Sequence, residues 1–142
     1  MIETRDAVPS DARALADLLG QLGYSVERDD VPARLERFTG KGNGRVLVAV
    51  SAGEIVGFAA LELTYPIHHP RPVAHLSAFA VAAGSRRQGV GRALLSAVED
   101  AARTQGCRRM VLTSAEQRAD AHLFYPAEGY SYTGRRFTKE LG

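Results

Sequence analysis

Two sequence patterns meet at Ser85-Arg86-Arg87-Gln88-Gly89-Val90-Gly91-Arg92-Ala93-Leu94, and this segment decides the fold. Before it, residues 73–81 are largely apolar and contain no Gly or Pro, which is typical of a buried strand. After it, apolar residues recur at helical spacing, namely Val90, Ala93, Leu94, Ala97, Val98 and Ala101. The segment therefore predicts a strand, a glycine-containing turn and a helix, in that order.

The turn has the features of an anion-binding site. Ser85 and Gln88 alone would form an ordinary capping box at a helix start. Gly89 and Gly91 would then lie in the first two helical turns, where each costs about 0.8–1 kcal/mol relative to Ala. Without Cβ atoms, however, backbone amides can approach a ligand closely, and the helix dipole favours negative charge there. Three arginines add positive charge at the same end, which favours a phosphate-bearing partner: Arg86, Arg87 and Arg92.

Two common nucleotide motifs do not fit this turn. A Walker P-loop needs Lys and then Ser or Thr after its last glycine, whereas Arg92 and Ala93 follow Gly91. The dinucleotide fingerprint needs a third glycine, where this chain has Leu94, and an acidic residue roughly 20 positions further on. The sequence in that region offers no carboxylate and reads Arg109-Met110-Val111-Leu112.

The turn resembles that of the GCN5-related N-acetyltransferases (GNAT family), whose signature Arg/Gln-x-x-Gly-x-Gly/Ala appears here as Arg86-Arg87-Gln88-Gly89-Val90-Gly91. In that family, main-chain amides of the turn hold the pyrophosphate of acetyl-coenzyme A (acetyl-CoA), after a strand that pairs with the pantetheine arm. The resemblance implies acetyl-CoA as cosubstrate. It also implies a strand bulge around residues 79–81 that exposes a backbone N–H to the thioester oxygen. The implied cofactor-binding residues are Phe79, Ala80, Val81, Arg86, Arg87, Gln88, Gly89, Val90, Gly91 and Arg92.

A second segment supports the resemblance. Residues 121–130, Ala-His-Leu-Phe-Tyr-Pro-Ala-Glu-Gly-Tyr, are similar to the family's Ala-x-x-Phe-Tyr-x-x-x-Gly-Phe/Tyr helix and turn. The resemblance implies that Tyr125 is the general acid that protonates the CoA thiolate, a task that suits a phenol with a pKa of about 10. The alternative is that Phe124 and Tyr125 are two aromatic residues of a core-facing helix. Pro126 departs from the family pattern and predicts a kinked or shortened helix.

The base that removes the acceptor's proton is left open by the sequence. Many relatives carry acidic residues shortly before the end of the fourth strand, where this chain has Ser77 and Ala78. Glu62 and His75 stay as candidates, and the alternatives are ordered water or an amine that arrives neutral. By simple strand alternation His75 would share a face with Val73, Ser77, Phe79 and Val81, where it could equally be a hydrogen-bonded core residue.

Other residues are candidates for the acceptor side. His68 and His69 are adjacent on a proline-flanked loop with no Cys or carboxylate cluster nearby, so we expect a surface loop and no metal site. The acceptor pocket in such folds is formed by the first two helices, the loop between strands three and four, and the C-terminal strands. Candidates to line it are Tyr24, Tyr65, His68 and Tyr132.

The composition agrees with a small enzyme. The 142 residues predict a single domain, 1–142, and the hydrophobic content of 45% and charged content of 24% are typical of a soluble globular protein. No apolar run approaches the roughly 20 residues of a membrane span. A net charge of +2, with arginines only in short pairs, argues against nucleic acid as a partner. The lack of a leader pattern and the single, idle thiol of Cys107 predict a cytoplasmic location.

The patterns along the chain predict the order β-α-α-β-β-β-α-β-α-β-β. The predicted strands are 2–8, 45–51, 55–63, 73–81, 109–114 and one or two within 130–141; the predicted helices lie between Ser10 and Gly23, at 32–38, from Val90 onward, and at 118–127. This order matches the acyl-CoA N-acyltransferase (GNAT) fold of the α/β (α+β) class. The match implies a mixed, mostly antiparallel central sheet of six or seven strands flanked by about four helices.

The functional hypothesis is an N-acetyltransferase that moves the acetyl group of acetyl-CoA directly to a primary amine of a small molecule or protein. Dimers are common in the resembling family, so a homodimer is one expectation. The alternative is a catalytically weak CoA-binding sensor or regulatory domain that has kept the turn and lost the chemistry.

Overall fold

The computed structural model describes residues 1–114 and 119–142. The chain forms two compact units, Met1–Val111 and Leu112–Gly142, and we describe each by itself. Arg118, the first residue of the last predicted helix, lies outside the described residues. Throughout the described part of the chain, every helix is too short or too polar to cross a bilayer.

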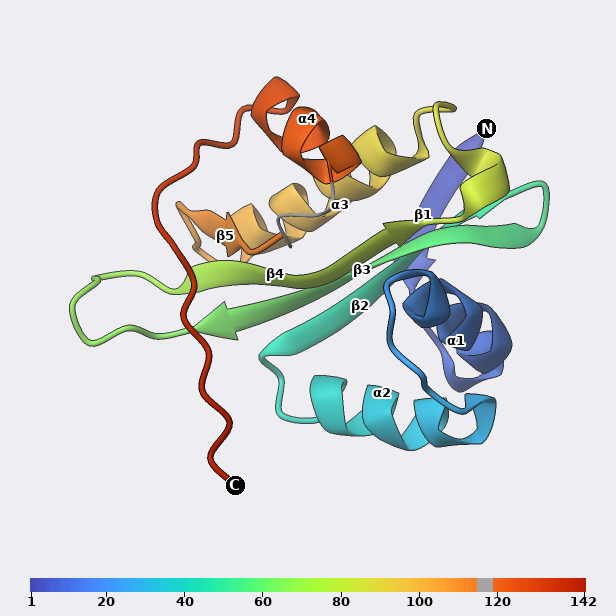
Figure 1. Ribbon diagram of the computed structural model, residues 1–142, viewed down its shortest axis with the longest axis horizontal. Coiled ribbons are helices and arrows are strands. Elements are labelled where there is room, and N and C mark those ends of the chain that lie inside the picture. Colours follow the sequence, from blue (N-terminus) through green and yellow to red (C-terminus); the bar gives the residue numbers. More distant parts are fainter. Residues whose placement is uncertain (115–118) are drawn as a thin grey trace. The chain divides into compact units, whose positions relative to one another are not determined.

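A five-stranded mixed sheet forms the centre of the fold, with the strands in the spatial order β1-β2-β3-β4-β5 (Figure 1). The first four strands are antiparallel neighbours. A two-residue turn joins β2 to β3, with φ of 51° at Ala52 and 79° at Gly53. Positive φ at both positions matches the twist of a tight hairpin and confirms the hairpin predicted there. The strands are Ile2–Asp6 (β1), Gly44–Ser51 (β2), Glu54–Thr64 (β3), Val73–Val81 (β4) and Met110–Leu112 (β5).

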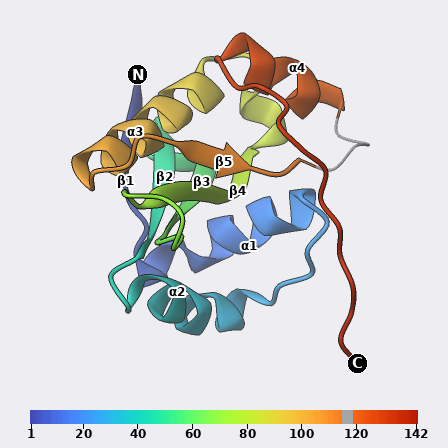
Figure 2. The ribbon, with the colours of Figure 1, turned by 90° about the vertical axis from the view of Figure 1, so that its left-hand side faces the viewer.

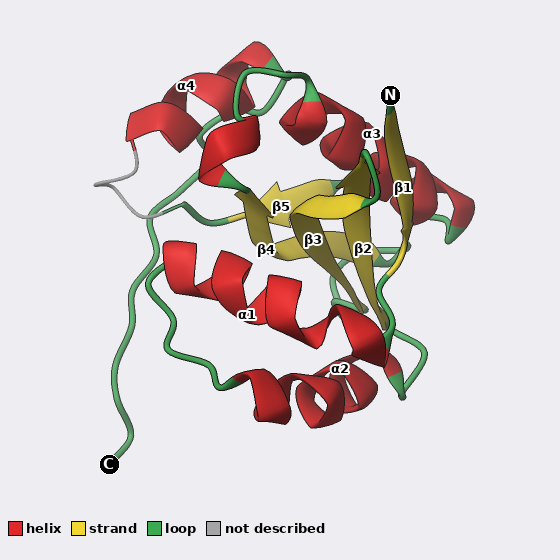
Figure 3. Ribbon diagram, turned by 90° about the vertical axis from the view of Figure 1, so that its right-hand side faces the viewer, coloured by secondary structure: helices red, strands yellow, loops and turns green. Residues whose placement is uncertain are grey.

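Helices cover both faces of this sheet. Figure 2 and Figure 3 show α1 (Ala12–Gln21) and α2 (Val31–Thr39) on one face and α3 (Val90–Thr104) on the other. On the α1–α2 face the buried core includes Leu15, Leu18, Val31, Val48, Phe58, Ala60 and Ala80. The α3 helix buries Val90, Leu94, Leu95, Val98 and Ala102. Three of these belong to the predicted apolar stripe, namely Val90, Leu94 and Val98, whereas the predicted Ala93, Ala97 and Ala101 are only partly buried. In the second unit, α4 spans Ala119–Ala127.

Gly57 on β3 lets α3 lie close to the sheet. A Cβ atom at this position would lie 3.0 Å from the Ala80 carbonyl oxygen and 3.2 Å from Val90 Cγ1. Any larger residue would therefore push away the first turn of α3, whose Val90 is only 2% exposed. Gly57 thus allows the first turn of α3 to pack closely against the sheet.

A β-bulge interrupts β4 at Ser77. Ala60 pairs with Ala78, and Leu61 pairs with Leu76, so Ser77 has no Cα partner on β3. Its hydroxyl instead donates a hydrogen bond to the Ala60 carbonyl at 3.3 Å. The family resemblance implied a bulge around residues 79–81 that splays β4 from the strand after it. The register shift at Ser77 is between β3 and β4 and does not test that prediction.

The bulge changes which face His75 shares with its neighbours. His75 pairs with Glu62, and directly opposed residues of two strands point to the same face. After the extra residue, Ala78 and Ala80 occupy that face, paired with Ala60 and Phe58. The predicted alternation of His75 with Phe79 and Val81 is therefore wrong, because those two pair with Ala59 and Gly57 on the α3 side.

The prediction of six or seven strands is not confirmed. Five strands are found among the described residues, and residues 130–142 contain no helix or strand. One or two strands were predicted within residues 130–141, yet Tyr132 is 79% and Phe137 91% exposed. Alternation specifies a strand only where a neighbouring strand and a buried face receive it, and neither is found here. The other predicted elements are present with bounds shifted by at most a few residues, and β4 has the predicted bounds.

An ion pair between the half-exposed Arg5 and the buried Asp11 connects the start of α1 to β1. Arg5 donates two hydrogen bonds to the carboxylate of Asp11, at 2.8 and 3.0 Å, and the backbone N–H of Val8 donates a third at 2.8 Å. The hydrogen bonds from Arg5 lower the pKa of Asp11, although its burial opposes this, and the Val8 amide adds to the lowering. Arg5 of β1 therefore stabilises the negatively charged form of Asp11 in the folded protein.

Candidate active site

The turn before α3 is built from two left-handed backbone positions. The strand β4 ends at Val81, a 3₁₀ turn follows at Ala83–Ser85, and α3 begins at Val90 with Gly89 as its N-cap. Gly89 has φ of +83°, and Arg87 has φ of +64°, which is uncommon for a residue with a Cβ atom. The capping-box alternative is wrong, because Ser85 ends the 3₁₀ turn and no side chain caps α3.

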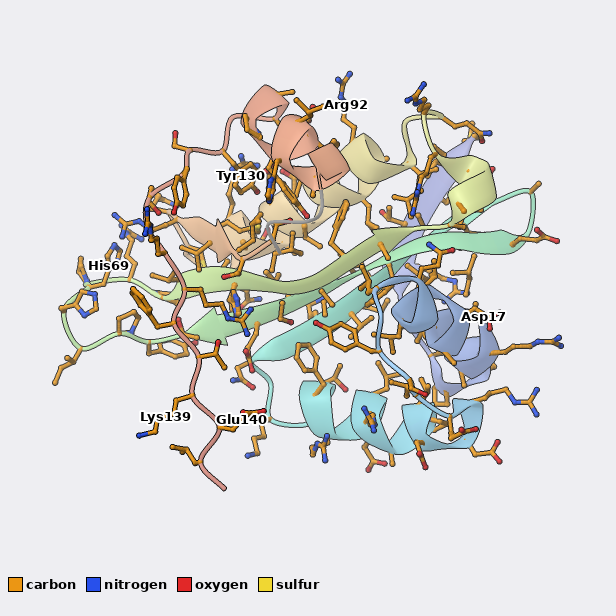
Figure 4. The ribbon with its side chains drawn as sticks, in the orientation of Figure 1. Asp17, His69, Arg92, Tyr130, Lys139 and Glu140 are labelled. Carbon is orange, nitrogen blue, oxygen red and sulfur yellow. The ribbon has the colours of Figure 1, made fainter. Side chains whose placement is uncertain are left out.

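Backbone amides and arginines of this turn can bind an anion. Among the described residues, no backbone acceptor is found for the amides of Arg87, Gln88 and Gly89. Alternating left-handed positions turn successive N–H groups toward one point, and the start of the 15-residue α3 adds its dipole. Arg86 and Arg87 are exposed, and the side chain of Arg92 projects from the first turn of α3 on the side away from the sheet (Figure 4). The glycine-containing turn between β4 and α3 is therefore present as predicted, and anion binding by it stays a prediction.

Gln21 links α1 to the end of β4, a contact that no sequence pattern predicted. Its amide nitrogen donates to the Val81 carbonyl at 3.1 Å, and its amide oxygen accepts from the Ala83 N–H at 3.3 Å. Both contacts lie 60 or more residues away along the chain. A single polar residue at a helix end has no pattern that predicts such a contact. Gln21 fixes the backbone where β4 passes into the anion-binding turn.

A pocket of about 720 Å³ lies on the α1–α2 face of the sheet. Its floor is apolar, formed by Leu15, Leu19, Val46, Phe58 and Ala60 among others. Its wall is polar and holds the carboxylate of Glu62, the bulged Ser77 and three cationic residues, Arg34, Arg37 and Lys41. Of the predicted acceptor-lining residues, Tyr24 lines this pocket, whereas Tyr65 and His68 do not. Tyr132 belongs to the second unit.

Both candidate bases lie together at this face. Glu62 Oε1 is 3.9 Å from His75 Nδ1, and the side chains are 40% and 36% exposed. The pair is ionic only when the imidazole is protonated. Glu62 lines the pocket, while His75 contacts Glu62 from the neighbouring strand. The arrangement can take up a proton at Glu62 and hold the carboxylate in place from His75.

Tyr125 lies in the last turn of α4, within the second unit. Its ring is edge-on to Phe124 and to Tyr130, with centroid distances of 5.3 and 5.8 Å. The helix continues to Ala127, so Pro126 does not end it before Tyr125. The backbone N–H of Tyr130 donates to the Tyr125 carbonyl at 3.0 Å, and Gly129 has φ of +96°, as expected of a helix C-cap. The cap and the two rings hold the tyrosine in one orientation within α4.

The remaining candidates have local roles. His69 Nδ1 lies 2.9 Å from the Arg71 carbonyl and 3.2 Å from the Arg71 nitrogen, within an exposed loop (Figure 4). In the part of the chain that the structure describes, no group of three potential metal ligands is found. Cys107 is 2% exposed, and burial raises the pKa of its thiol, so the thiolate is disfavoured.

Comparison with known proteins identifies the family. The model of the acetyltransferase (GNAT) family matches residues 12–130. The chain therefore belongs to the GNAT family, whose acetyltransferases use acetyl-CoA, and it is an acetyl-CoA-dependent N-acetyltransferase.

Two curated relatives and one solved structure illustrate the similarity. The aminoalkylphosphonate N-acetyltransferase of Salmonella typhimurium is 31% identical over 98% of this chain and 91% of its own length. The aminoglycoside N(6')-acetyltransferase type 1 of Stenotrophomonas maltophilia is 36% identical over 92% of this chain and 87% of its own. A transcriptional regulator from Bacillus halodurans C-125 has the same fold, with a TM-score of 0.88, 23% identity, and coverage of 99% of this chain and all (100%) of its own.

Proposed function

We propose that this enzyme transfers the acetyl group of acetyl-CoA to the primary amine of a small molecule bound in the pocket on the α1–α2 face. The observation that carries the proposal is the carboxylate of Glu62 in the wall of a pocket of about 720 Å³, a volume suited to a small organic ligand. The names of both curated relatives describe acceptors that are small amines, which supports this class of acceptor.

The cosubstrate would be held by the end of β4 and by the turn before α3. The cradle of amides at Arg87, Gln88 and Gly89 suits a pyrophosphate, with Val90 and Gly91 continuing into the first turn of α3. Arg86, Arg87 and Arg92 would add charge to the same anion. By resemblance to the family, the backbone of Phe79, Ala80 and Val81 would pair with the pantetheine arm. When bound, acetyl-CoA supplies the acetyl group as a thioester, and the reaction replaces a C–S bond by a C–N bond.

Two side chains of this chain would move the protons. Glu62 would accept the proton that the acceptor ammonium loses, and His75 would orient the Glu62 carboxylate from 3.9 Å away. Tyr125 would donate its phenolic proton to the departing sulfur. The nitrogen loses two protons on going from ammonium to amide. The first is taken by Glu62 and passes to solvent, and the second balances the proton that Tyr125 donates to the sulfur.

The proposal is tested by an amine panel assayed for thiol release, with acetyl-CoA binding measured in parallel by titration calorimetry. Acetyl-CoA binding together with amine-dependent thiol release is the expected result. Binding without release from any amine would favour the sensor or regulatory alternative, whereas absence of binding would refute the assignment of the turn. A cytoplasmic location, a homodimer and a single domain over residues 1–142 stay as predictions from the sequence.

A further inference from the structure

The wall of the pocket carries more positive than negative charge, and this bears on the acceptor. We infer that the acceptor amine carries an anionic group, a phosphonate, phosphate or carboxylate, which Arg34, Arg37 and Lys41 recognise while the amine points to Glu62. The inference rests on the proposed function, since it takes the pocket to be the acceptor site.

Three cationic residues line the pocket, and we call them the cationic stripe. Arg34 and Arg37 are three residues apart on α2, the spacing of one helix face, and Lys41 lies in the turn that follows the helix. All three are exposed. No ion pair is found for any of them within residues 1–114 and 119–142. Three cations without a carboxylate partner on one wall are available to an anionic ligand.

The helix dipole does not explain this stripe. A cation is favourable in the last turn of a helix, and Arg37 has that place in α2. Arg34 is the fourth residue of the same helix, close to its positive end, where a cation is disfavoured. Its presence on the pocket wall is instead favourable when an anion is bound.

The pairing of β2 with β3 places Glu62 near the loop that joins α2 to β2. Glu62 is the carboxylate in the lining, and it pairs with Gly44 at the start of β2. The Asn43 carbonyl accepts a hydrogen bond from the Leu63 N–H at 2.7 Å, so the loop that carries Lys41 ends beside the residue that follows Glu62. A short molecule with an amine at one end and an acid at the other matches this distribution. A polyamine or a polycationic sugar would place further positive charges against the cationic stripe.

The test compares four acceptors of similar length at one pH by thiol release: 2-aminoethylphosphonate, β-alanine, propylamine and 1,3-diaminopropane. We expect kcat/KM to be at least about tenfold higher for the better of the two acids than for propylamine, and lowest for the diamine. The phosphonate and carboxylate arms show which anion is preferred. Raising the salt concentration should increase KM for the acids alone.

Variants connect the preference to the stripe. Arg34→Gln and Arg37→Gln should each raise KM for the preferred acid about tenfold, the loss expected for one charge-assisted hydrogen bond, with little change in kcat. KM for propylamine should stay the same. The matched control is Arg13→Gln on α1, which lines a separate hollow together with Asp17 and should change neither value.

The outcomes separate this inference from the proposed function. Thiol release with propylamine or the diamine at rates equal to or above those of the acids would overturn the inference and leave the acetyltransferase function standing. If no amine releases thiol although acetyl-CoA binds, the proposed function fails. Calorimetric titration of the four compounds into the CoA-bound protein then compares their affinities without catalysis. Equal affinities for the acids and the other two amines would overturn the inference.

Discussion

Glu62 on β3 and His75 on β4 are direct cross-strand partners, with 3.9 Å between Oε1 and Nδ1 at the side of the sheet that carries the pocket. Only Glu62 lines the pocket itself. Under the proposed function, Glu62 is the base and His75 is a positioning residue, and the sequence alone could not choose between the two.

Glu62→Gln is expected to lower kcat by about 10²–10³-fold, because an amide cannot accept the proton of the acceptor ammonium. His75→Asn should have a smaller effect, within about tenfold, because it removes only the group that holds the carboxylate. Steady-state thiol release measures both variants. A larger loss in the His75 variant than in the Glu62 variant would exchange the two roles.

Tyr125→Phe should reduce kcat by about 10–100-fold while leaving the Kd for acetyl-CoA within about twofold. Phenylalanine retains the edge-on contacts with Phe124 and Tyr130, so the loss reports on the hydroxyl. Tyr130→Phe serves as the control, because it removes a hydroxyl from the same aromatic group. Unchanged turnover in the Tyr125 variant would reject the acid role.

Gly89→Ala should weaken acetyl-CoA binding about tenfold. A Cβ atom at Gly89 meets open space, but φ of +83° is a left-handed conformation that costs a residue other than Gly about 1–2 kcal/mol. Gly84→Ala is the matched control, since it also adds a Cβ into open space, without a positive φ. Titration calorimetry compares the two, and equal affinities would show that the backbone conformation of the turn does not determine binding.

Gly57→Ala should lower the free energy of unfolding by about 1–3 kcal/mol, because the added Cβ crowds the Ala80 carbonyl and Val90. Acetyl-CoA binding should weaken as well, because the first turn of α3 moves with Val90. Gly20→Ala, inside α1 and with nothing within 4 Å, is expected to stabilise by up to about 1 kcal/mol. Thermal unfolding of both variants tests the contrast.

Asp11→Asn should destabilise the fold by about 1–3 kcal/mol at neutral pH, because it removes the negative charge and one of the two carboxylate oxygens that accept hydrogen bonds from Arg5. The folded-state pKa of Asp11 lies below its unfolded value of about 3.9, so this contribution is complete above that value and is lost as the pH falls through the lowered pKa. Urea unfolding at pH 7 and below pH 3 should show the difference from the unsubstituted protein shrinking in acid. Asp6→Asn, which removes an exposed pair with Arg45, should cost less than about 1 kcal/mol.

Local chemistry explains which parts of the fold the sequence predicts well. Three features depend on residues close together in the chain, and sequence patterns can therefore predict them: the bounds of β4, the glycine turn before α3 and the apolar face of that helix. The Ala52-Gly53 hairpin is readable for the same reason. The glycines and arginines from which an anion-binding role of the turn is predicted are also close together in the chain.

Long-range packing explains what the sequence did not predict. The bulge at Ser77 depends on how β4 pairs with β3, and the double contact of Gln21 depends on a segment 60 residues away. The cationic stripe of Arg34, Arg37 and Lys41 looks like any solvated helix face until the fold places it on the pocket wall. Residues 130–141 alternate like a strand and yet form none, since alternation carries no information about a partner strand.

The bulge at Ser77 also determines how β4 tolerates changes in length. Ser77 is the extra residue between the two registers of β4. Deleting it would turn the side chains on one side of the bulge to the opposite face of the sheet. Either His75 would leave Glu62, or Phe79 and Val81 would leave the α3 side for the pocket. A single-residue deletion in β4 is therefore expected to disrupt packing on both the α1–α2 face and the α3 face of the sheet. The exposed loop before Val73, in contrast, should tolerate insertions.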